Sequence, residues 1–504
     1  MTMVPAASGD SIFWTNGRVV EVGSGSDIAR RIPAGTPEFD FPDAIITPGF
    51  VDSHTHFVQW ALGRNQVQLA GAGSRIEAVA RVATGVPVQG WVIGQGWDAN
   101  HWSDPPTRWA LDAVQMGPVY LDSLDVHAAW VNSAGLTAAG ITRSSRDPDG
   151  GRIVRDSSGE PTGLLLERAV ELMLPVLPVP PLDVRISAVL EAQKEAHRLG
   201  ITGIHNVEGH AAYQPFSVLD QRGQLRLRVL FHHPVADLAD LVGGGIRSGE
   251  GSAWLTEGGI KMFLDGSLGS RTAWMLEPYE GSRDRGMAIT SESMASQAMQ
   301  LAAENGIASV VHAIGDAAVR RALTLMEGLS GTAIRHRIEH FQCVHPQDLE
   351  RAARAGIVLS MQPAHILTDI PLAERHWGAR SAGAYAFRSL LNTGAVLAFG
   401  SDTPVASIDP RDGVFAAMSR SSEAITGSWF PEERLDLSAV IRAYTAAPAF
   451  AAGLDDRRGT LAPGMDADLV VWQTPAEVER ADGSAFRAGH VALTAVNGEV
   501  VYLR

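Results

Sequence analysis

The sequence has a single cysteine, Cys343, and few basic residues, and each shortage excludes a class of protein. One cysteine can form no disulfide within the chain and cannot supply a cysteine-rich zinc module. Lys and Arg number 41 against 56 Asp and Glu, which gives a formal net charge of −15. A chain of this charge lacks the basic surface that nucleic acids or a polybasic membrane anchor require.

Long hydrophobic runs are also missing. No apolar segment is long enough to cross a bilayer, and residues 1–10 lack the charged start and apolar core of a secretory signal. We therefore expect a cytoplasmic protein without a membrane or nucleic-acid partner. Hydrophobic residues nevertheless make up 45% of the 504 residues and charged residues 19%. This composition excludes a disordered chain and predicts an extensive core.

Short apolar runs alternate with helical segments over most of the chain, which is typical of βαβ units and a parallel sheet. Eight such runs predict a (β/α)8 TIM barrel of the α/β class, with its chemistry at the C-terminal ends of the strands. The predicted strands are Pro48–Ser53, Ile201–Asn206, Arg226–Phe231, Gly259–Leu264, Ile307–His312, Arg335–His340, Ile357–Met361 and Val396–Gly400. The predicted helices between them are Asp183–Leu199, Ser291–Asn305, Ala317–Gly328 and Pro346–Ala355.

Two regions depart from the barrel pattern. Both ends of the chain contain short strands with Asn-Gly turns, at Asn16-Gly17 and Asn497-Gly498. Residues 1–47 and 455–504 are therefore predicted to form one small β-domain beside a barrel of residues 48–454. The interval between the first two barrel strands is too long for a βα connection, so residues 60–180 are predicted to be an inserted subdomain over the mouth of the barrel.

Side chains that suit a metal ion lie at the ends of the predicted strands. They are His54, His56, Lys261, His312, His340 and Asp402. Since alternate residues of a strand point to the same side, His54 and His56 can reach one metal. Imidazole nitrogen combined with carboxylate oxygen suits Zn²⁺, and Mn²⁺, Ni²⁺ or Fe²⁺ are alternatives.

Lys261 is a cation in a predicted cation site. Burial beside metal ions would lower the pKa of its amine and favour reaction with CO2, and the resulting carbamate could bridge two metals. A lysine that snorkels to water or pairs with the substrate is the alternative.

Six segments carry motifs in a fixed order along nearly the whole chain. They are residues 46–56 (ITPGFVDSHTH), Lys261 with 265–270 (DGSLGS), 312–316 (HAIGD), 337–340 (RIEH), 400–404 (GSDTP) and 459–470 (GTLAPGMDADLV). As an ordered set they resemble the amidohydrolase superfamily, and more narrowly its YtcJ-like branch, which includes N-substituted formamide deformylases. The resemblance implies that the terminal β-domain is a small β-sandwich.

The resemblance also implies a ligand set and a mechanism. His54, His56 and Asp402 would hold one divalent metal, His312 and His340 a second, and carbamylated Lys261 would lie between them. A metal-bound hydroxide would attack the scissile carbonyl, and Asp402 would carry a proton to the leaving amine. Zn²⁺ is the expected ion, and a homodimer is the expected assembly.

Three segments of the insertion also resemble this branch, and they predict the substrate contacts. They contain Trp97 (residues 94–98), His127 (residues 123–133) and Glu167 (residues 163–167). We predict that His127 is catalytic and donates a hydrogen bond to the substrate carbonyl, and that Trp97, Glu167 and Arg271 bind the substrate. The alternatives are a structural histidine, core packing of the tryptophan and a surface ion pair of Arg271.

The predicted activity is hydrolysis of the amide C–N bond of a small, apolar or aromatic N-acyl or N-formyl compound. An esterase or lactonase would use the same groups, and a mononuclear deaminase would use the same barrel. A non-catalytic relative should have lost at least one ligand, and none is lost here.

Overall fold

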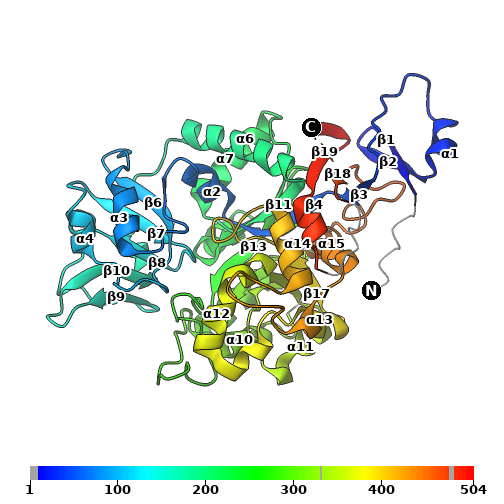
Figure 1. Cartoon of the computed structure of the whole chain (residues 1–504). Coiled ribbons are helices and arrows are strands. Elements are labelled where there is room, and N and C mark those ends of the chain that lie inside the picture. Colours follow the sequence, from blue (N-terminus) through cyan, green and yellow to red (C-terminus); the bar gives the residue numbers. More distant parts are fainter. Residues whose placement is uncertain (1–8, 330–331, 476–481) are drawn as a thin grey trace.

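The computed structural model describes residues 9–329, 332–475 and 482–504. Its centre is a sheet of eight parallel strands in the order β17-β16-β15-β14-β13-β12-β11-β4 (Figure 1). These strands are β4 (Phe50–Thr55), β11 (Ile201–Asn206), β12 (Arg228–Pro234), β13 (Leu255–Phe263), β14 (Ser309–Ala313), β15 (Arg337–His340), β16 (Val358–Met361) and β17 (Val396–Phe399). The segment after β17 closes the circle, because the Asp402 amide donates to the His54 carbonyl at 2.8 Å and the His56 amide to the Thr403 carbonyl at 2.9 Å. The predicted barrel is confirmed, and each predicted strand overlaps an observed one.

Helices cover the outside of this barrel. The larger ones are α6 (Leu182–Arg198), α7 (His210–Gln221), α9 (Glu292–Glu304), α10 (Asp316–Met326), α12 (Ile366–Trp377), α14 (Pro410–Ser419) and α15 (Leu437–Tyr444). The prediction of one helix over residues 346–355 is wrong. The chain forms the 3-10 turn η3 (Pro346–Asp348) and then α11 (Arg351–Ala355). The break accompanies the inward turn of Asp348, which is 2% exposed and binds the Arg320 and Arg351 guanidiniums.

The segment between β4 and α6 forms a second, six-stranded sheet on one side of the barrel, drawn in cyan in Figure 1. Its order is β5-β6-β7-β8-β10-β9, with β5 (Val67–Gln68), β6 (Val92–Trp97), β7 (Val119–Ser123), β8 (Ala128–Val131), β9 (Gly151–Arg155) and β10 (Pro161–Glu167). The helices α3 (Arg75–Ala83), α4 (Arg108–Asp112) and α5 (Ser133–Ala138) belong to the same region. Trp97, Trp102 and Trp130 pack together in its core, with 6.0 Å between the ring centroids of the last two.

A third sheet joins the two ends of the chain in the order β20-β19-β18-β3. Its strands are β3 (Ala44–Pro48), β18 (Leu469–Gln473), β19 (His490–Val496) and β20 (Glu499–Leu503), and the hairpin β1 (Ser11–Thr15) and β2 (Arg18–Gly23) is a separate sheet beside it. β3 continues through Gly49 directly into β4. A Cβ atom at Gly49 would lie 2.1 Å from the Thr202 hydroxyl oxygen, so the close approach of these two segments requires glycine. The residue limits predicted for the three regions stay predictions.

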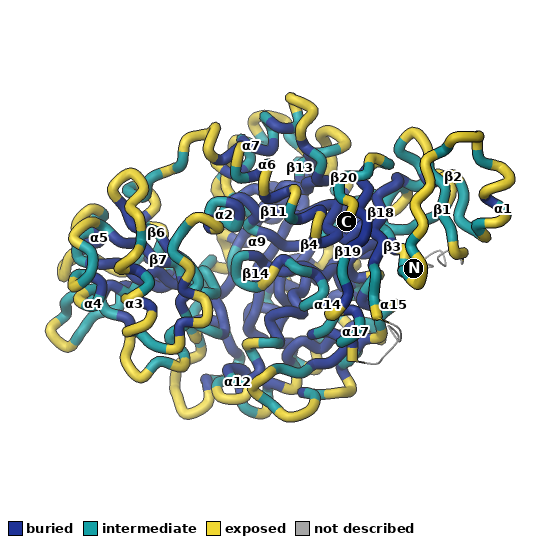
Figure 2. The backbone as a smooth tube through the Cα atoms, turned by 45° about the horizontal axis from the view of Figure 1, so that its top comes forward, coloured by how far each residue is buried: buried dark blue, intermediate teal, exposed yellow. Residues whose placement is uncertain are grey.

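Burial follows this arrangement. The barrel strands are buried, whereas the hairpin β1–β2 is mostly intermediate or exposed (Figure 2). Within the described residues, the model contains no helix whose length and apolar character would let it span a membrane.

Candidate metal centre and active-site cavity

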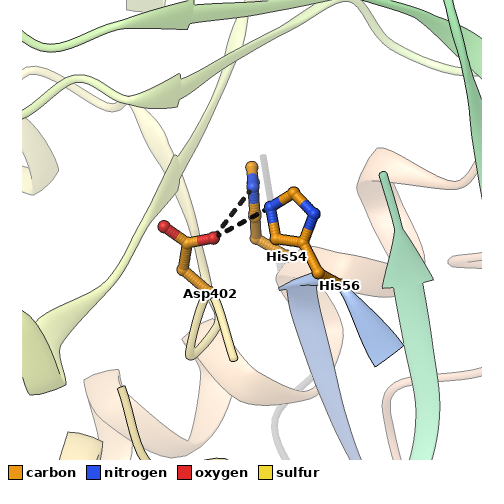
Figure 3. A group of neighbouring side chains, drawn as sticks. All are labelled: His54, His56 and Asp402. Carbon is orange, nitrogen blue, oxygen red and sulfur yellow. Dashed lines mark ion pairs between the residues drawn. The ribbon is translucent and has the colours of Figure 1, made fainter. Parts of the chain in front are cut away.

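The chain brings His54, His56 and Asp402 together at one end of the barrel (Figure 3). His54 lies near the end of β4, His56 precedes the helix α2 (Phe57–Gly63), and Asp402 follows β17. The Nε2 atoms of both histidines lie 3.4 Å from Asp402 Oδ1. One potential ligand atom from each of the three residues lies within 4.8 Å of the others, which is the spacing of a metal site.

The other predicted ligands border this cluster. The His312 and His340 rings lie with their centroids 4.4 Å apart, and His340 is 5.0 Å from His54 by the same measure. His340 Nδ1 is 4.0 Å from Asp402 Oδ2. All six side chains named in the sequence therefore lie at the same end of the barrel.

The amine of Lys261 has an unusual environment. The side chain lies on β13, is 4% exposed, and places Nζ 4.4 Å from the centroid of the Phe263 ring. Its Nζ has no hydrogen-bond partner among the described residues. Burial lowers the pKa of Lys261 to about 8, although Glu339 and Asp402 act in the opposite direction. A substantial fraction of the amine is therefore neutral near physiological pH.

For the carboxylate of Asp402, the neighbouring side chains outweigh the effect of burial on the pKa. Burial alone would raise its pKa, but His54, His56 and His340 hold the pKa of Asp402 well below its usual range. Burial lowers the pKa values of His54, His312 and His340. Both kinds of shift favour loss of the proton, and the deprotonated carboxylate and imidazole are the forms that bind a divalent cation.

Glu339 and Arg337 support the cluster from inside the barrel. They lie two residues apart on β15, so both side chains point to the same side of the strand, which is the barrel interior. His340 should point to the other side, but its φ of +69° ends the strand alternation and turns its ring inward as well. The Glu339 carboxylate pairs with His54 Nδ1 and with the Arg337 guanidinium. The paired nitrogen leaves His54 Nε2 to face Asp402.

A cavity of about 360 Å³ lies between the barrel end and the inserted sheet. Five residues predicted from the sequence line it, and they are Trp97, His127, Arg271, His340 and Asp402. Apolar side chains of Leu166, Leu268 and Leu372 form part of its wall.

Glu167 lies behind His127 and is not among the residues that line this cavity. Its Oε2 is 2.7 Å from His127 Nδ1, and its Oε1 accepts a hydrogen bond from the Thr272 hydroxyl. Burial alone would lower the pKa of His127, but the Glu167 carboxylate raises it to about 9. The arrangement supports an orienting contact with His127 in place of the direct substrate contact that the sequence predicted for Glu167.

Sequence reasoning missed two residues of the site. His365, in the turn η4 (Pro363–His365) after β16, has its Nε2 3.9 Å from Asp402 Oδ2. Asp125 accepts hydrogen bonds from the hydroxyls of Ser123, Ser267 and Ser270 and so joins the insertion to the loop after β13. The position of His365 after a predicted barrel strand was a signal for it, whereas two of the three partners of Asp125, Ser267 and Ser270, are about 140 residues away in the sequence.

The barrel with this cluster defines the class of metal-dependent barrel hydrolases, and comparisons with known proteins agree. The family model described as the amidohydrolase family matches residues 38–502. The chain therefore belongs to the amidohydrolase family. This membership confirms the family and the assignment as an amidohydrolase enzyme that the motifs predicted.

Three curated relatives align over nearly the whole chain. Protein LONG AFTER FAR-RED 3 of Arabidopsis thaliana is 33% identical over 92% of this chain and 84% of its own. YtcJ of Bacillus subtilis is 32% identical over 95% of this chain and 94% of its own. The N-substituted formamide deformylase of Arthrobacter pascens is 26% identical over 98% and 95%.

Among solved structures, an uncharacterized metal-dependent hydrolase of Pyrococcus horikoshii OT3 superposes with a TM-score of 0.76. It is 26% identical, and the match covers 94% of each chain. A match over 94% of this chain extends beyond the barrel.

Proposed function

We propose that this amidohydrolase uses two divalent metal ions, with Zn²⁺ as the expected ion, to hydrolyse the amide bond of a small N-acyl or N-formyl compound. The observation that carries the proposal is the metal-site grouping of His54, His56 and Asp402, with the His312 and His340 rings beside it, next to a cavity of about 360 Å³. The partial identity with an N-substituted formamide deformylase supports the choice of an amide substrate.

The residues present fit two ions. His54, His56 and Asp402 would hold one, and His312 and His340 would hold the other. The buried Lys261 Nζ, which lacks a hydrogen-bond partner in the described chain, supports its conversion to a bridging ligand. The neutral amine would form a bond to the carbon of CO2 and lose a proton, which gives a carbamate with one negative charge and two ligand oxygens.

Divalent ions at these residues would lower the pKa of a bound water toward neutrality and polarise the substrate carbonyl. The side chains then have distinct tasks. Asp402 would accept the proton of the attacking water and deliver it to the leaving nitrogen. His127, whose Nδ1 is held by Glu167, would donate from Nε2 to the substrate carbonyl oxygen. The balanced reaction takes one amide and one water to one carboxylic acid and one amine.

Metal content and hydrolysis test the proposal together. Protein purified without chelator and with bicarbonate should contain about two metal ions per chain by elemental analysis. Lys261→Ala should contain fewer and should lose hydrolysis of N-formyl and N-acyl amides, measured as equal amounts of acid and amine. The sequence contains one other lysine, the exposed Lys194, so Lys194→Ala is a matched control that should change neither value.

One metal ion per chain, unchanged in Lys261→Ala, would remove the lysine from the site and favour a mononuclear enzyme. Two metal ions without any release of amine would reject amides as substrates.

A further inference from the structure

Two exposed arginines line the cavity and have no charge partner in the part of the chain that the structure describes. Arg152 extends from β9 of the insertion, and Arg271 from the loop after β13 of the barrel. Neither guanidinium has a hydrogen-bond or ion-pair partner among the described residues. Of the described residues that line the cavity, these two carry a permanent positive charge.

Some arginines of the insertion have partners, since Arg155 pairs with Asp147 and Arg168 with Glu171. Others, such as Arg143, have none among the described residues, so the position of Arg152 and Arg271 in the cavity lining is what distinguishes them. The same lining contains four aspartates, so the two guanidiniums offer local contacts for an anion and not a positive field over the whole cavity.

The acidic residues of the cavity form no ion pair with either arginine among the described residues. Asp125 accepts from three serine hydroxyls, and Asp369 accepts from the Tyr385 hydroxyl at 2.6 Å and the Gln342 amide at 2.8 Å. Asp98 accepts from the backbone and side chain of Asn100.

The backbone of both arginines is bonded to neighbouring segments. On the paired strands β9 and β10, Arg152 is directly opposite Leu166, which also lines the cavity, and Val154 lines it two residues further along β9. Arg271 has a φ of +56°, and its neighbours on both sides bind the insertion, Ser270 through Asp125 and Thr272 through Glu167. The two arginines therefore approach the cavity from two segments that are joined to each other.

The polar and apolar parts of the cavity are therefore arranged for an amphipathic molecule. The Trp97, Val154 and Leu166 side chains offer an apolar wall, and the candidate metal ligands lie at the barrel end. Each guanidinium carries the planar fork of N–H donors that matches a carboxylate. In an N-formyl compound the acyl part has no room for a second group, so a carboxylate must lie on the amine side.

We propose that the substrates are N-acyl or N-formyl derivatives of amino acids with an apolar or aromatic side chain, and that Arg152 and Arg271 bind their carboxylate. This inference rests on the proposed amide hydrolysis. It goes further because it assigns the charge of the substrate and adds Arg152, which carries a binding role that the motifs did not indicate.

The decisive comparison uses two substrates that differ only in the carboxylate, N-formylphenylalanine and N-formyl-2-phenylethylamine. The wild-type enzyme should prefer the acid in kcat/KM by about 100-fold, since each hydrogen-bonded charge pair contributes about a factor of 10. Arg152→Gln and Arg271→Gln should each reduce that preference by about 10-fold or more. Arg152→Lys keeps the charge without the fork and should retain part of it.

Arg143→Gln is the matched control, because Arg143 is an exposed arginine of the insertion outside the cavity lining. It should leave the preference unchanged. Equal kcat/KM for the two substrates in the wild-type enzyme, or an equal preference in all variants, would overturn the inference while the proposed amide hydrolysis stands.

Binding of analogues that cannot be hydrolysed gives a second readout. The ketone 2-benzyl-4-oxopentanoate is N-acetylphenylalanine with the amide NH replaced by CH2. The corresponding carboxamide has the same shape but no negative charge. By titration calorimetry the acid should bind about 100-fold more tightly than the carboxamide, and the two glutamine variants should lose that difference. If neither formyl compound is hydrolysed, the proposed function fails, and this binding ratio alone still decides whether the arginines select an anion.

Discussion

At the scale of single residues, Glu339 determines which nitrogen His54 presents to the metal centre. Its carboxylate holds Nδ1, so Nε2 is the atom 3.4 Å from Asp402. Burial alone would raise the pKa of Glu339, but Arg337 and His54 hold it well below its usual range. The negative charge behind the ring makes the opposite nitrogen a better donor to a cation.

We expect Glu339→Gln to weaken metal binding by about 10- to 100-fold, because the amide fills the same space without the charge. Competition with a chromophoric chelator measures the dissociation constant directly. Glu191→Gln, on the exposed face of α6, provides the control. An unchanged dissociation constant would show that Glu339 stabilises the barrel without tuning the centre.

At the scale of elements, the insertion and the loop of residues 264–272 form one unit through two buried carboxylates. Asp125 accepts hydrogen bonds from the hydroxyls of Ser267 and Ser270 at 2.6 and 2.8 Å, and Glu167 accepts one from the Thr272 hydroxyl. Gly269 accommodates this contact, since a Cβ there would lie 2.8 Å from Asp125 Oδ2. The cavity wall therefore depends on hydrogen bonds between segments far apart in sequence.

Asp125→Asn should loosen this junction, because the amide has one oxygen to accept where the carboxylate had two. The cost should be about 1–3 kcal/mol of local stability. Amide hydrogen exchange should become faster at residues 265–272 and stay unchanged in the terminal sheet, and KM should rise about 10-fold. Asp147→Asn is the control, because Asp147 pairs with Arg155 on the solvent side of the same region. Uniformly faster exchange throughout the chain would contradict a local role.

The same elements show how far sequence reasoning reaches. The barrel strands and the six potential ligands were predictable, because buried parallel strands are continuous apolar runs and their C-terminal ends converge. The cavity was not, because only the position of the insertion over the barrel brings Arg152, an exposed residue of an edge strand, into its lining. Glu167 was assigned to the substrate for the same reason: the sequence gives no sign that His127 and Thr272 occupy its oxygens.

At the scale of the whole molecule, the terminal sheet is attached to the barrel through α6. The carbonyl of His197, in the last turn of that helix, accepts from the Thr494 hydroxyl of β19 at 2.7 Å. The His197 ring donates from Nε2 to the Arg226 carbonyl at 2.9 Å. Burial lowers the pKa of His197 to about 4.

This shift makes the stability depend on pH in a defined direction. Below a pH of about 6.5, the ordinary pKa of histidine, His197 binds a proton in the unfolded chain but not in the folded chain. Its contribution to the free energy of unfolding is therefore fully present above pH 6.5 and is lost as the pH falls toward 4. The loss at pH 5 should be about 2 kcal/mol. His197→Gln keeps an N–H donor without the titration, so its thermal midpoint should fall less between pH 7.5 and 5.0. Parallel curves for the variant and wild type would contradict this origin, and the exposed His101→Gln should match the wild type.

The interior of the barrel below the candidate metal ligands contains a buried arginine. Arg337 is 1% exposed and is bonded to His205 at 2.7 Å and to Ser360 at 2.8 Å. A barrel interior packed in this way is a core and not a pore, so the cavity beside the insertion is the side from which a molecule would reach the ligands. In the proposed hydrolysis, the acid, the amine and the next substrate would all use that side, and an acid that stayed bound would compete with the substrate.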